Sequence, residues 1–272
     1  MQRLSCKPRP DNLDEPVLLT VRNVGRILDL YSVETPERGP TEVGAELGMG
    51  KSKAQLLMAS MAEIGLLRRV AGGRYRAGWR ALELERIVRE TAPFRAVAYP
   101  VAERLARHSG ETVHVAALDA GQVVYVDRLR GARAIEIPVS QVGSTAPAHC
   151  SSVGKVLLAH LEPGEIDAIL DRRGLPRFTP ATITDRDALY AELHRVRRDG
   201  VAYDREEILR GLACVGAPIM DGEGSVVAAM SIAAPVERFA TSEAAYRSAV
   251  VRAARSVTER LREFRAQPSS PT

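Results

Sequence analysis

The chain has 272 residues, which is long for one domain and sufficient for two. Hydrophobic residues make up 45%, enough to bury a core, and the three cysteines, Cys6, Cys150 and Cys214, are too few and too scattered for a disulfide framework. The segment Met1–Pro10 lacks the apolar stretch of a signal peptide, and the longest apolar run, Val226–Val236, is too short to cross a bilayer. We therefore expect a cytoplasmic protein in a reducing compartment, without a membrane partner.

The net charge of +4 is small, but its distribution is uneven. Between Gly48 and Arg80 seven basic side chains face a single acid, whereas basic and acidic residues nearly balance over 91–272. A local basic patch is typical of phosphate binding, although a solvated surface gives the same pattern.

The first elements in the chain have the pattern of a small helical domain. After a polar tail over residues 1–16, which we predict to be disordered, an apolar stripe predicts a helix over 17–33. The segment 35–40 contains two prolines and ends this helix. A short second helix is expected over 42–47, with Thr41 as its N-cap.

A Gly-Met-Gly turn at 48–50 leads into a third helix over 51–64, which Gly65 ends. Its inward face is expected to carry Ala54, Leu57, Met58, Met61 and Ile64. Two helices joined by so tight a turn form a helix-turn-helix, whose second helix enters the DNA major groove. The side chains expected to reach double-stranded DNA from its first turn are Lys51, Ser52, Lys53 and Gln55.

A basic β-hairpin is predicted directly after these helices. Two strand-forming runs over 66–76 flank Gly72-Gly73, a pair that suits a tight turn. Behind a helix-turn-helix such a hairpin is a wing, and Arg74 at its tip would reach the DNA backbone or minor groove. An ordinary surface hairpin is the alternative, but helices followed by a basic hairpin are more specific than either motif alone. We therefore assign 17–78 to a winged helix-turn-helix.

The next stretch, 79–91, is predicted to be a linker helix that transmits orientation or supports dimers, with a solvated spacer as the alternative. Beyond it, a helix is expected over 94–108, and alternating apolar runs predict three strands, over 112–118, 122–129 and 134–139. The remaining elements in chain order are helices over 154–161, 163–171 and 185–198, strands over 214–220 and 225–233, and a helix over 242–264 before a disordered tail, 267–272. Consecutive strands flanked by helices predict an α+β domain with an antiparallel sheet over 92–266.

Four residues of this second domain, His149, Cys150, Asp204 and Cys214, have versatile chemistry. They can line a ligand pocket, in which backbone N–H groups around 151–154 would hold a carboxylate, or the cysteines can be plain core residues. A zinc site lacks the usual ligand spacing, and a His149–Cys150 nucleophile pair on a strand would be split between two faces. We expect no metal, no cofactor and no catalytic residue.

Three stretches of the sequence resemble the IclR family of bacterial transcriptional regulators, and the similarity covers roughly 17–264. They are Gly65 with Gly72-Gly73-Arg74-Tyr75-Arg76-Ala77-Gly78; Gly110-Glu111-Thr112-Val113 with Val124-Tyr125-Val126-Asp127-Arg128; and Pro147-Ala148-His149-Cys150-Ser151-Ser152-Val153-Gly154-Lys155, which the segments 200–207 and 211–219 support. The resemblance implies a winged helix-turn-helix, a GAF-like effector domain, and dimers or dimers of dimers on palindromic operators. It implies effectors that are small organic acids, aromatics or related metabolites.

By this resemblance, the effector pocket would be lined by Ala148, His149, Cys150, Ser151, Asp204, Cys214 and Ser231, with apolar surface from Leu129, Ile137 and Val139. The sequence departs from the family pattern at Leu56, where Arg is common, and at Lys53, where Thr is usual. Losing a planar guanidinium changes base recognition, so the operator is expected to differ, or Lys51, Lys53 and Gln55 take over the contact. An enzyme, or an interaction module that has lost DNA binding, are the competing functions.

Overall fold

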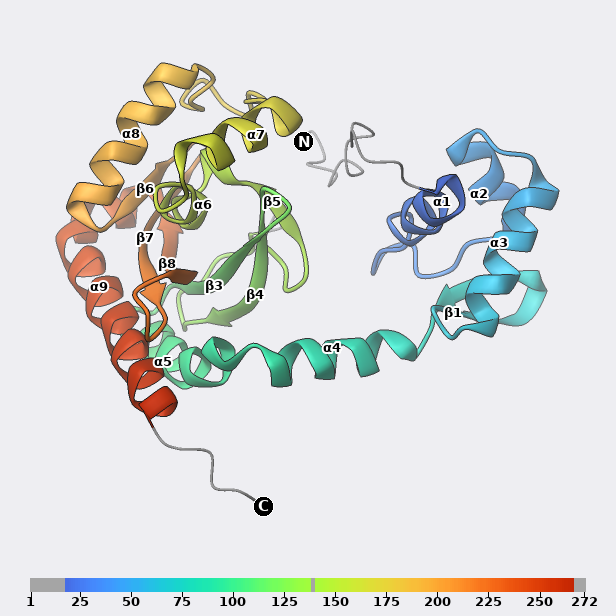
Figure 1. Ribbon diagram of the computed structural model, residues 1–272, viewed down its shortest axis with the longest axis horizontal. Helices are drawn as coiled ribbons and strands as arrows, with labels where there is room; N and C mark the ends of the chain where they lie inside the picture. Colours follow the sequence, from blue (N-terminus) through green and yellow to red (C-terminus); the bar gives the residue numbers. More distant parts are fainter. Residues whose placement is uncertain (1–17, 138–139, 267–272) are drawn as a thin grey trace. The chain divides into compact units, whose positions relative to one another are not determined.

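The structure is a computed structural model that describes residues 18–137 and 140–266 (Figure 1). By their contacts the described residues divide into two compact units, 18–91 and 92–266. The disorder predicted for 1–16 and 267–272 falls outside the described residues. Among the described helices, none combines the length and the apolar character needed to cross a membrane.

The first unit is built around three helices, α1 (Leu19–Leu28), α2 (Pro40–Leu47) and α3 (Lys51–Glu63). The helix predicted over 17–33 is shorter at its C-terminal end, because the chain leaves it at Asp29 through tight turns at Leu30 and Tyr31. Its apolar stripe is only partly buried: Ile27 is fully buried, whereas Val21 is 60% exposed.

The helix-turn-helix forms as predicted, with corrections at its ends. The N-cap of α2 is Gly39 rather than Thr41, and the Gly39 N–H donates to the Glu42 carboxylate at 3.2 Å. Gly48 ends α2 with a φ of 65°, which allows the chain to turn directly into α3. Of the expected inward face of α3, Ile64 is the exception, since it caps the helix and is half exposed.

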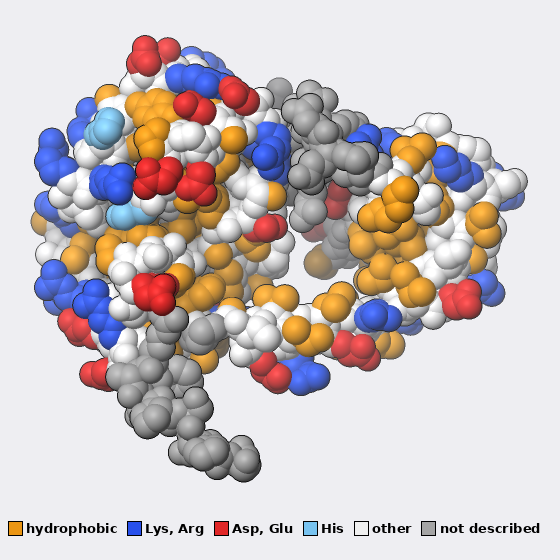
Figure 2. Space-filling view, in the orientation of Figure 1, with side chains coloured by type: hydrophobic (Ala, Val, Ile, Leu, Met, Phe, Trp, Pro, Cys, Tyr) orange, Lys and Arg blue, Asp and Glu red, His pale blue; other side chains and the backbone are white. Residues whose placement is uncertain are grey.

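A two-stranded hairpin of β1 (Leu67–Arg69) and β2 (Tyr75–Ala77) completes this fold. Both Gly72 and Gly73, in the turn η1 (Ala71–Gly73), have a φ of 71°, so the glycine pair is required by the backbone. The following helix, α4 (Arg80–Thr91), has no buried residue, and its apolar side chains are exposed along its length (Figure 2).

The second unit contains a six-stranded antiparallel sheet in the order β5-β4-β3-β8-β7-β6. Its strands are β3 (Thr112–Asp119), β4 (Gln122–Arg130), β5 (Thr145–Pro147), β6 (Ala202–Arg205), β7 (Leu212–Met220) and β8 (Val226–Pro235). One face is covered by α5 (Pro93–Ser109) and α9 (Val236–Ala266), the other by α6 (Ser152–Leu158), α7 (Pro163–Arg173) and α8 (Arg186–Asp199) (Figure 1). The α+β prediction is therefore confirmed.

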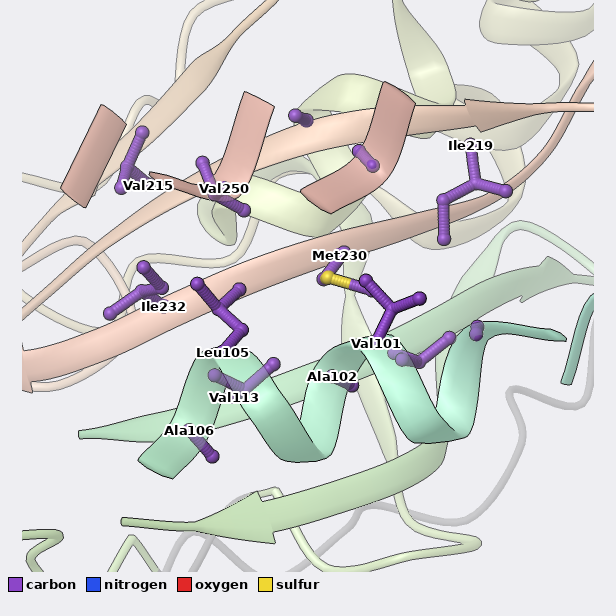
Figure 3. Packing of buried hydrophobic residues seen from close by; sticks show 14 of the residues in the cluster. Val101, Ala102, Leu105, Ala106, Val113, Val215, Ile219, Met230, Ile232 and Val250 are labelled. Atoms are coloured by element: carbon purple, nitrogen blue, oxygen red, sulfur yellow. The ribbon is translucent and has the colours of Figure 1, made fainter. Parts of the chain in front are cut away.

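Side-chain alternation in the central strands separates the two faces. On β8, Met230 and Ile232 pack against α5 and α9 in a continuous apolar layer (Figure 3), while Ser231 between them points to the side of α6. A partly buried ion pair ties this layer to the sheet, since the fully buried Glu111 accepts two hydrogen bonds from the more exposed Arg238 of α9, at 2.9 and 2.8 Å.

Some predicted elements of this unit are wrong. Residues 134–137 form no strand, because Arg133 and Ala134 fold back in turns against Gly110 and Gly131, and β4 pairs with β5 instead. The short strands β5 and β6 were not predicted, and α9 begins six residues earlier than expected, at Val236.

Candidate DNA-reading and ligand-binding sites

The exposed first turn of α3 is the candidate DNA-reading surface. Ala54, Leu57, Met58 and Met61 are buried and fix the helix against the core, which leaves Lys51, Ser52 and Lys53 exposed on its outer side. Gln55 is also exposed, but its Nε2 donates to the buried Tyr75 hydroxyl at 2.9 Å, so it is partly committed to the wing. Leu56 is 69% exposed on the same helix.

Arg74 of the wing is engaged within the protein. Its guanidinium donates to both carboxylate oxygens of Glu42 on α2, at 2.6 and 3.0 Å, and to the Glu37 carbonyl at 2.8 Å. The Arg74 hydrogen bonds hold the pKa of Glu42 below its usual range. Arg74 thus orients the wing against α2, and its predicted contact with DNA stays a prediction.

A small polar cavity lies between the sheet and α6 in the second unit. Its lining consists of His114, Tyr125, Ile137, Ser140, Ser151, Ser152, Val153, Asp204, Ile208, Leu212, Cys214 and Ser231. The cavity volume is about 10 Å³, which leaves room for about one water molecule. A larger ligand must displace side chains that fill this space.

Strand register explains why these polar groups meet. His114 on β3 is directly opposite Arg128 on β4 and Ser231 on β8, and Ser231 is opposite Gly216 on β7, so all four lie on the same face. His114 Nε2 shares a hydrogen bond of 2.9 Å with the Ser140 hydroxyl. Burial, with the nearby Arg128 charge, lowers the pKa of His114 to about 3, so the ring is neutral.

A cluster of charges lies at the opposite end of the cavity. The fully buried Lys155 of α6 donates to Glu207 at 2.6 Å and to Glu192 of α8 at 3.2 Å. Asp204 accepts from the Glu207 N–H at 2.7 Å, and burial together with the Glu207 charge raises the pKa of Asp204 to about 7. Burial and the neighbouring Asp204 raise the pKa of the Cys214 thiol, which therefore stays protonated.

The structure brings together four of the residues predicted to line the pocket: Ser151, Asp204, Cys214 and Ser231. Ile137 also lines it, whereas Val139 lies outside the described residues. Leu129 packs on the opposite face, against the α5 and α9 layer, because a β-bulge between Val115 and Ala116 shifts the register with β4.

The segment η2 (Ala148–Cys150) is buried beside the cavity and does not line it. His149 Nε2 pairs with the Pro176 carbonyl at 3.1 Å, and the Cys150 thiol donates to the Pro147 carbonyl, so each is used separately. Ser151 Oγ caps α6 by accepting from the Gly154 N–H at 3.1 Å, which removes one of the donors expected to hold a carboxylate. Within the described residues, no three His, Cys, Asp or Glu side chains are grouped to hold a metal ion.

Sequence reasoning missed four polar residues of this face: His114, Tyr125, Arg128 and Ser140. The alternation along 112–118 puts His114 on one face of the strand and the apolar Val113 and Val115 on the other. This alternation is the sequence signal that could have identified His114 as a polar residue of the cavity face. Ser140 follows a segment that was expected to be a strand, and no periodicity marks it.

Comparisons with known proteins agree with this two-part architecture. A family model described as bacterial transcriptional regulator IclR C-terminal matches residues 87–259. The chain is 32% identical to the HTH-type transcriptional regulator XynR of Escherichia coli over 231 residues, 85% of this chain and 91% of that protein. The solved structure of the Thermotoga maritima IclR is similar with a TM-score of 0.71 and 29% identity, covering 89% of this chain and 98% of that one. An IclR homologue from Microbacterium hydrocarbonoxydans, complexed with 4-hydroxybenzoate, gives a TM-score of 0.78 and 28% identity over 90% of this chain and 99% of that one.

Proposed function

The chain belongs to the IclR family of bacterial transcriptional regulators, and on that premise we propose that it is a homodimeric switch on a palindromic operator, controlled by a small organic acid or aromatic effector. As a family member it is a DNA-binding transcriptional regulator with an effector-binding C-terminal domain, and not an enzyme. The observation that supports DNA reading best is the exposed first turn of α3, in which Lys51, Ser52 and Lys53 project from a helix anchored by its other face. We place the winged helix-turn-helix at 17–78, the linker helix at 79–91 and the effector domain at 92–266, in a cytoplasmic protein.

Self-association is supported by the apolar surface of the linker helix. Leu82, Leu84, Ile87 and Val88 of α4 are between 45% and 61% exposed, in a helix that buries none of its residues in the described structure. Exposed apolar stripes of this kind are typical of interaction surfaces. We propose a second copy of the chain as the partner, because two reading heads match the two halves of a palindrome.

Effector control is supported by the buried polar cavity of the second domain. Ser231, Cys214 and Asp204 meet there with His114, and buried polar groups of this kind supply specificity in ligand sites. The Microbacterium relative is complexed with 4-hydroxybenzoate, which supports an aromatic acid as one effector class to test here. Coupling between effector and DNA of this type typically amounts to about 1–3 kcal/mol.

Fluorescence-polarisation binding to the DNA upstream of the chain's own gene, against a scrambled duplex at two salt concentrations, tests this proposal. We expect tight, sequence-selective binding that weakens steeply with salt. Lys53→Ala should lower the affinity and reduce the salt slope by about one, whereas Arg172→Ala, an exposed change on α7, should alter neither. Equal binding to both duplexes, followed by a genome-wide selection that enriches no fragment, would refute DNA reading by this head.

A further inference from the structure

Arg128 is a buried cation whose hydrogen-bonding capacity is largely unused. Its side chain is 6% exposed, and its Nε and Nη2 have no hydrogen-bond partner. Its Nη1 lies 3.6 Å from a carboxylate oxygen of Glu136, a side chain that is itself 58% exposed. Buried donors without acceptors cost free energy, and native proteins rarely retain them without a use. The two unpaired nitrogens therefore indicate that an acceptor is bound there in another state of the protein.

The position of Arg128 connects it to the ligand cavity. It is directly opposite His114 in the β3–β4 pairing, and His114 in turn is directly opposite Ser231 on β8. Because neighbouring strands are about 4.8 Å apart, the backbones of Arg128 and Ser231 are separated by about 10 Å, measured straight across the sheet through His114. His114 lies between them and lines the cavity together with its hydrogen-bond partner Ser140, so Arg128 is next to the cavity without being part of its lining.

The two ends of this line differ in charge. Beyond Ser231 lie the buried acids Asp204 and Glu207, with Lys155 already paired to Glu207. At the other end is the Arg128 guanidinium. The acids offer an organic anion no attraction, whereas the Arg128 guanidinium attracts it.

We propose that Arg128 binds the carboxylate of an elongated effector acid whose opposite end carries a hydroxyl or similar group that bonds to Ser231 and Cys214. This inference rests on the proposed effector function of the same cavity. A guanidinium binds a carboxylate through two parallel N–H bonds, and Arg128 has two unpaired nitrogens, one of them Nε, available for such a fork.

Glu136 faces the Nη1 of Arg128 and leaves its Nε and Nη2 unpaired. It is 3.6 Å from Arg128, a distance too long for a hydrogen bond, while Arg130 donates to it at 2.8 Å and Gln141 at 3.2 Å. An effector can therefore form the stronger bonds with Arg128 and leave Glu136 paired to Arg130. The site should therefore prefer monocarboxylates long enough to reach from Arg128 to Ser231, and should bind shorter acids and neutral analogues more weakly.

Thermal unfolding of the full-length protein with matched probes tests the assignment. The probes are sodium acetate, sodium 4-hydroxybutyrate and sodium 4-hydroxybenzoate, each compared with sodium chloride at equal ionic strength and with its neutral amide. We expect at least one of the two long hydroxy acids to stabilise the wild-type protein more than acetate, chloride or the amides do.

Arg128→Met should abolish this stabilisation and weaken binding at least tenfold. Arg130→Met is the matched control: Arg130 is two residues along the same strand, pairs with the same Glu136 and is 52% exposed, so its removal should weaken binding far less than Arg128→Met does. Without ligand, Arg128→Met should unfold at the wild-type temperature or above, because it removes an unpaired buried charge. Arg128→Lys, which keeps the charge and loses the fork, should show intermediate affinity and provides the readout if the methionine variant does not fold.

The proposal is overturned if the carboxylates stabilise Arg128→Met and wild type equally, if amides and acids act alike, or if none of the acids exceeds chloride. Operator binding by each variant, measured in parallel, separates this failure from failure of the proposed function. Retained operator binding with an inert Arg128 rejects only the carboxylate site, whereas absence of operator binding by wild type rejects the regulator proposal.

Discussion

Replacing Lys155 with methionine should destabilise the effector domain by about 3–5 kcal/mol, the cost of removing one partner from a buried ion pair. The Lys155 side chain is 1% exposed, and its Nζ lies 2.6 Å from Glu207 and 3.2 Å from Glu192. Without this ammonium, the two carboxylates and the adjacent Asp204 lose the cation that compensates their negative charge. Methionine occupies nearly the same volume as the lysine side chain, so the cost comes from the lost charge and not from a cavity. For a domain of about 170 residues each kcal/mol lowers Tm by about 2–4 °C, so the expected decrease is about 6–20 °C.

The single tryptophan of the chain allows the two domains to be followed separately. Trp79 lies in the unit 18–91, so its fluorescence reports that unit, while calorimetry of the same sample records both transitions. We expect Lys155→Met to lower the effector-domain transition and leave the Trp79 transition in place. Adding Glu207→Gln should recover part of the loss, because it neutralises the nearest carboxylate. A cost under about 1 kcal/mol, as for an exposed ion pair, would refute the reasoning that this charge is buried and essential.

Three further changes test other parts of the structure. Burial raises the pKa of Asp204 to about 7, so the folded state holds a proton that the unfolded chain releases near its ordinary value of about 4. This group should therefore cost about 2–3 kcal/mol of stability as the pH rises from about 5 to about 8. Denaturant unfolding at the two pH values should show that Asp204→Asn removes this loss. An equal loss of unfolding free energy in wild type and variant would contradict the reasoning. Gly154→Ala makes a Cβ clash with the Ala148 carbonyl oxygen and should cost about 1–3 kcal/mol or more, whereas Gly164→Ala, with nothing within 4 Å, should be nearly neutral by thermal unfolding. Equal stabilities would disprove the close approach. Arg74→Met should weaken operator binding by the same factor at every salt concentration, because it frees the wing from its carboxylate partner on α2, and a salt slope reduced by about one would instead indicate a direct phosphate contact.

The winged helix-turn-helix was predictable because the residues that determine it are local in sequence. Ala54, Leu57, Met58 and Met61 repeat at helical spacing and are all buried, and Gly72-Gly73 supplies the two positive φ values that the hairpin needs. Its errors lie at element ends, where competing caps decide. The N-cap of α2 is Gly39, whose N–H bonds to Glu42, and not Thr41, which lies two residues further along the chain.

The cavity was only partly predictable, because its geometry depends on pairing between distant strands. The bulge opposite Val115 and Ala116 turns Leu129 away from the cavity, and no local pattern in β4 announces it. The strand Ala202–Arg205 is four residues long and gives too little alternation to be recognised, although it positions Asp204 beside Cys214. Arg128 was missed for a similar reason, since its burial follows from the register with His114 and not from its own sequence neighbours.

The two faces of the effector-domain sheet have different energetic roles. The face toward α5 and α9 is a continuous apolar layer, closed at one end by the satisfied Glu111–Arg238 pair. The face toward α6 holds groups whose burial is costly: Arg128 with two unpaired nitrogens, Thr112 with an unpaired hydroxyl, and Asp204 with its raised pKa. Stability provided by the first face permits these unfavourable groups on the second. A ligand that satisfies them binds the folded state selectively, and the same differential contacts supply the free energy that can bias the protein between its DNA-bound and free forms.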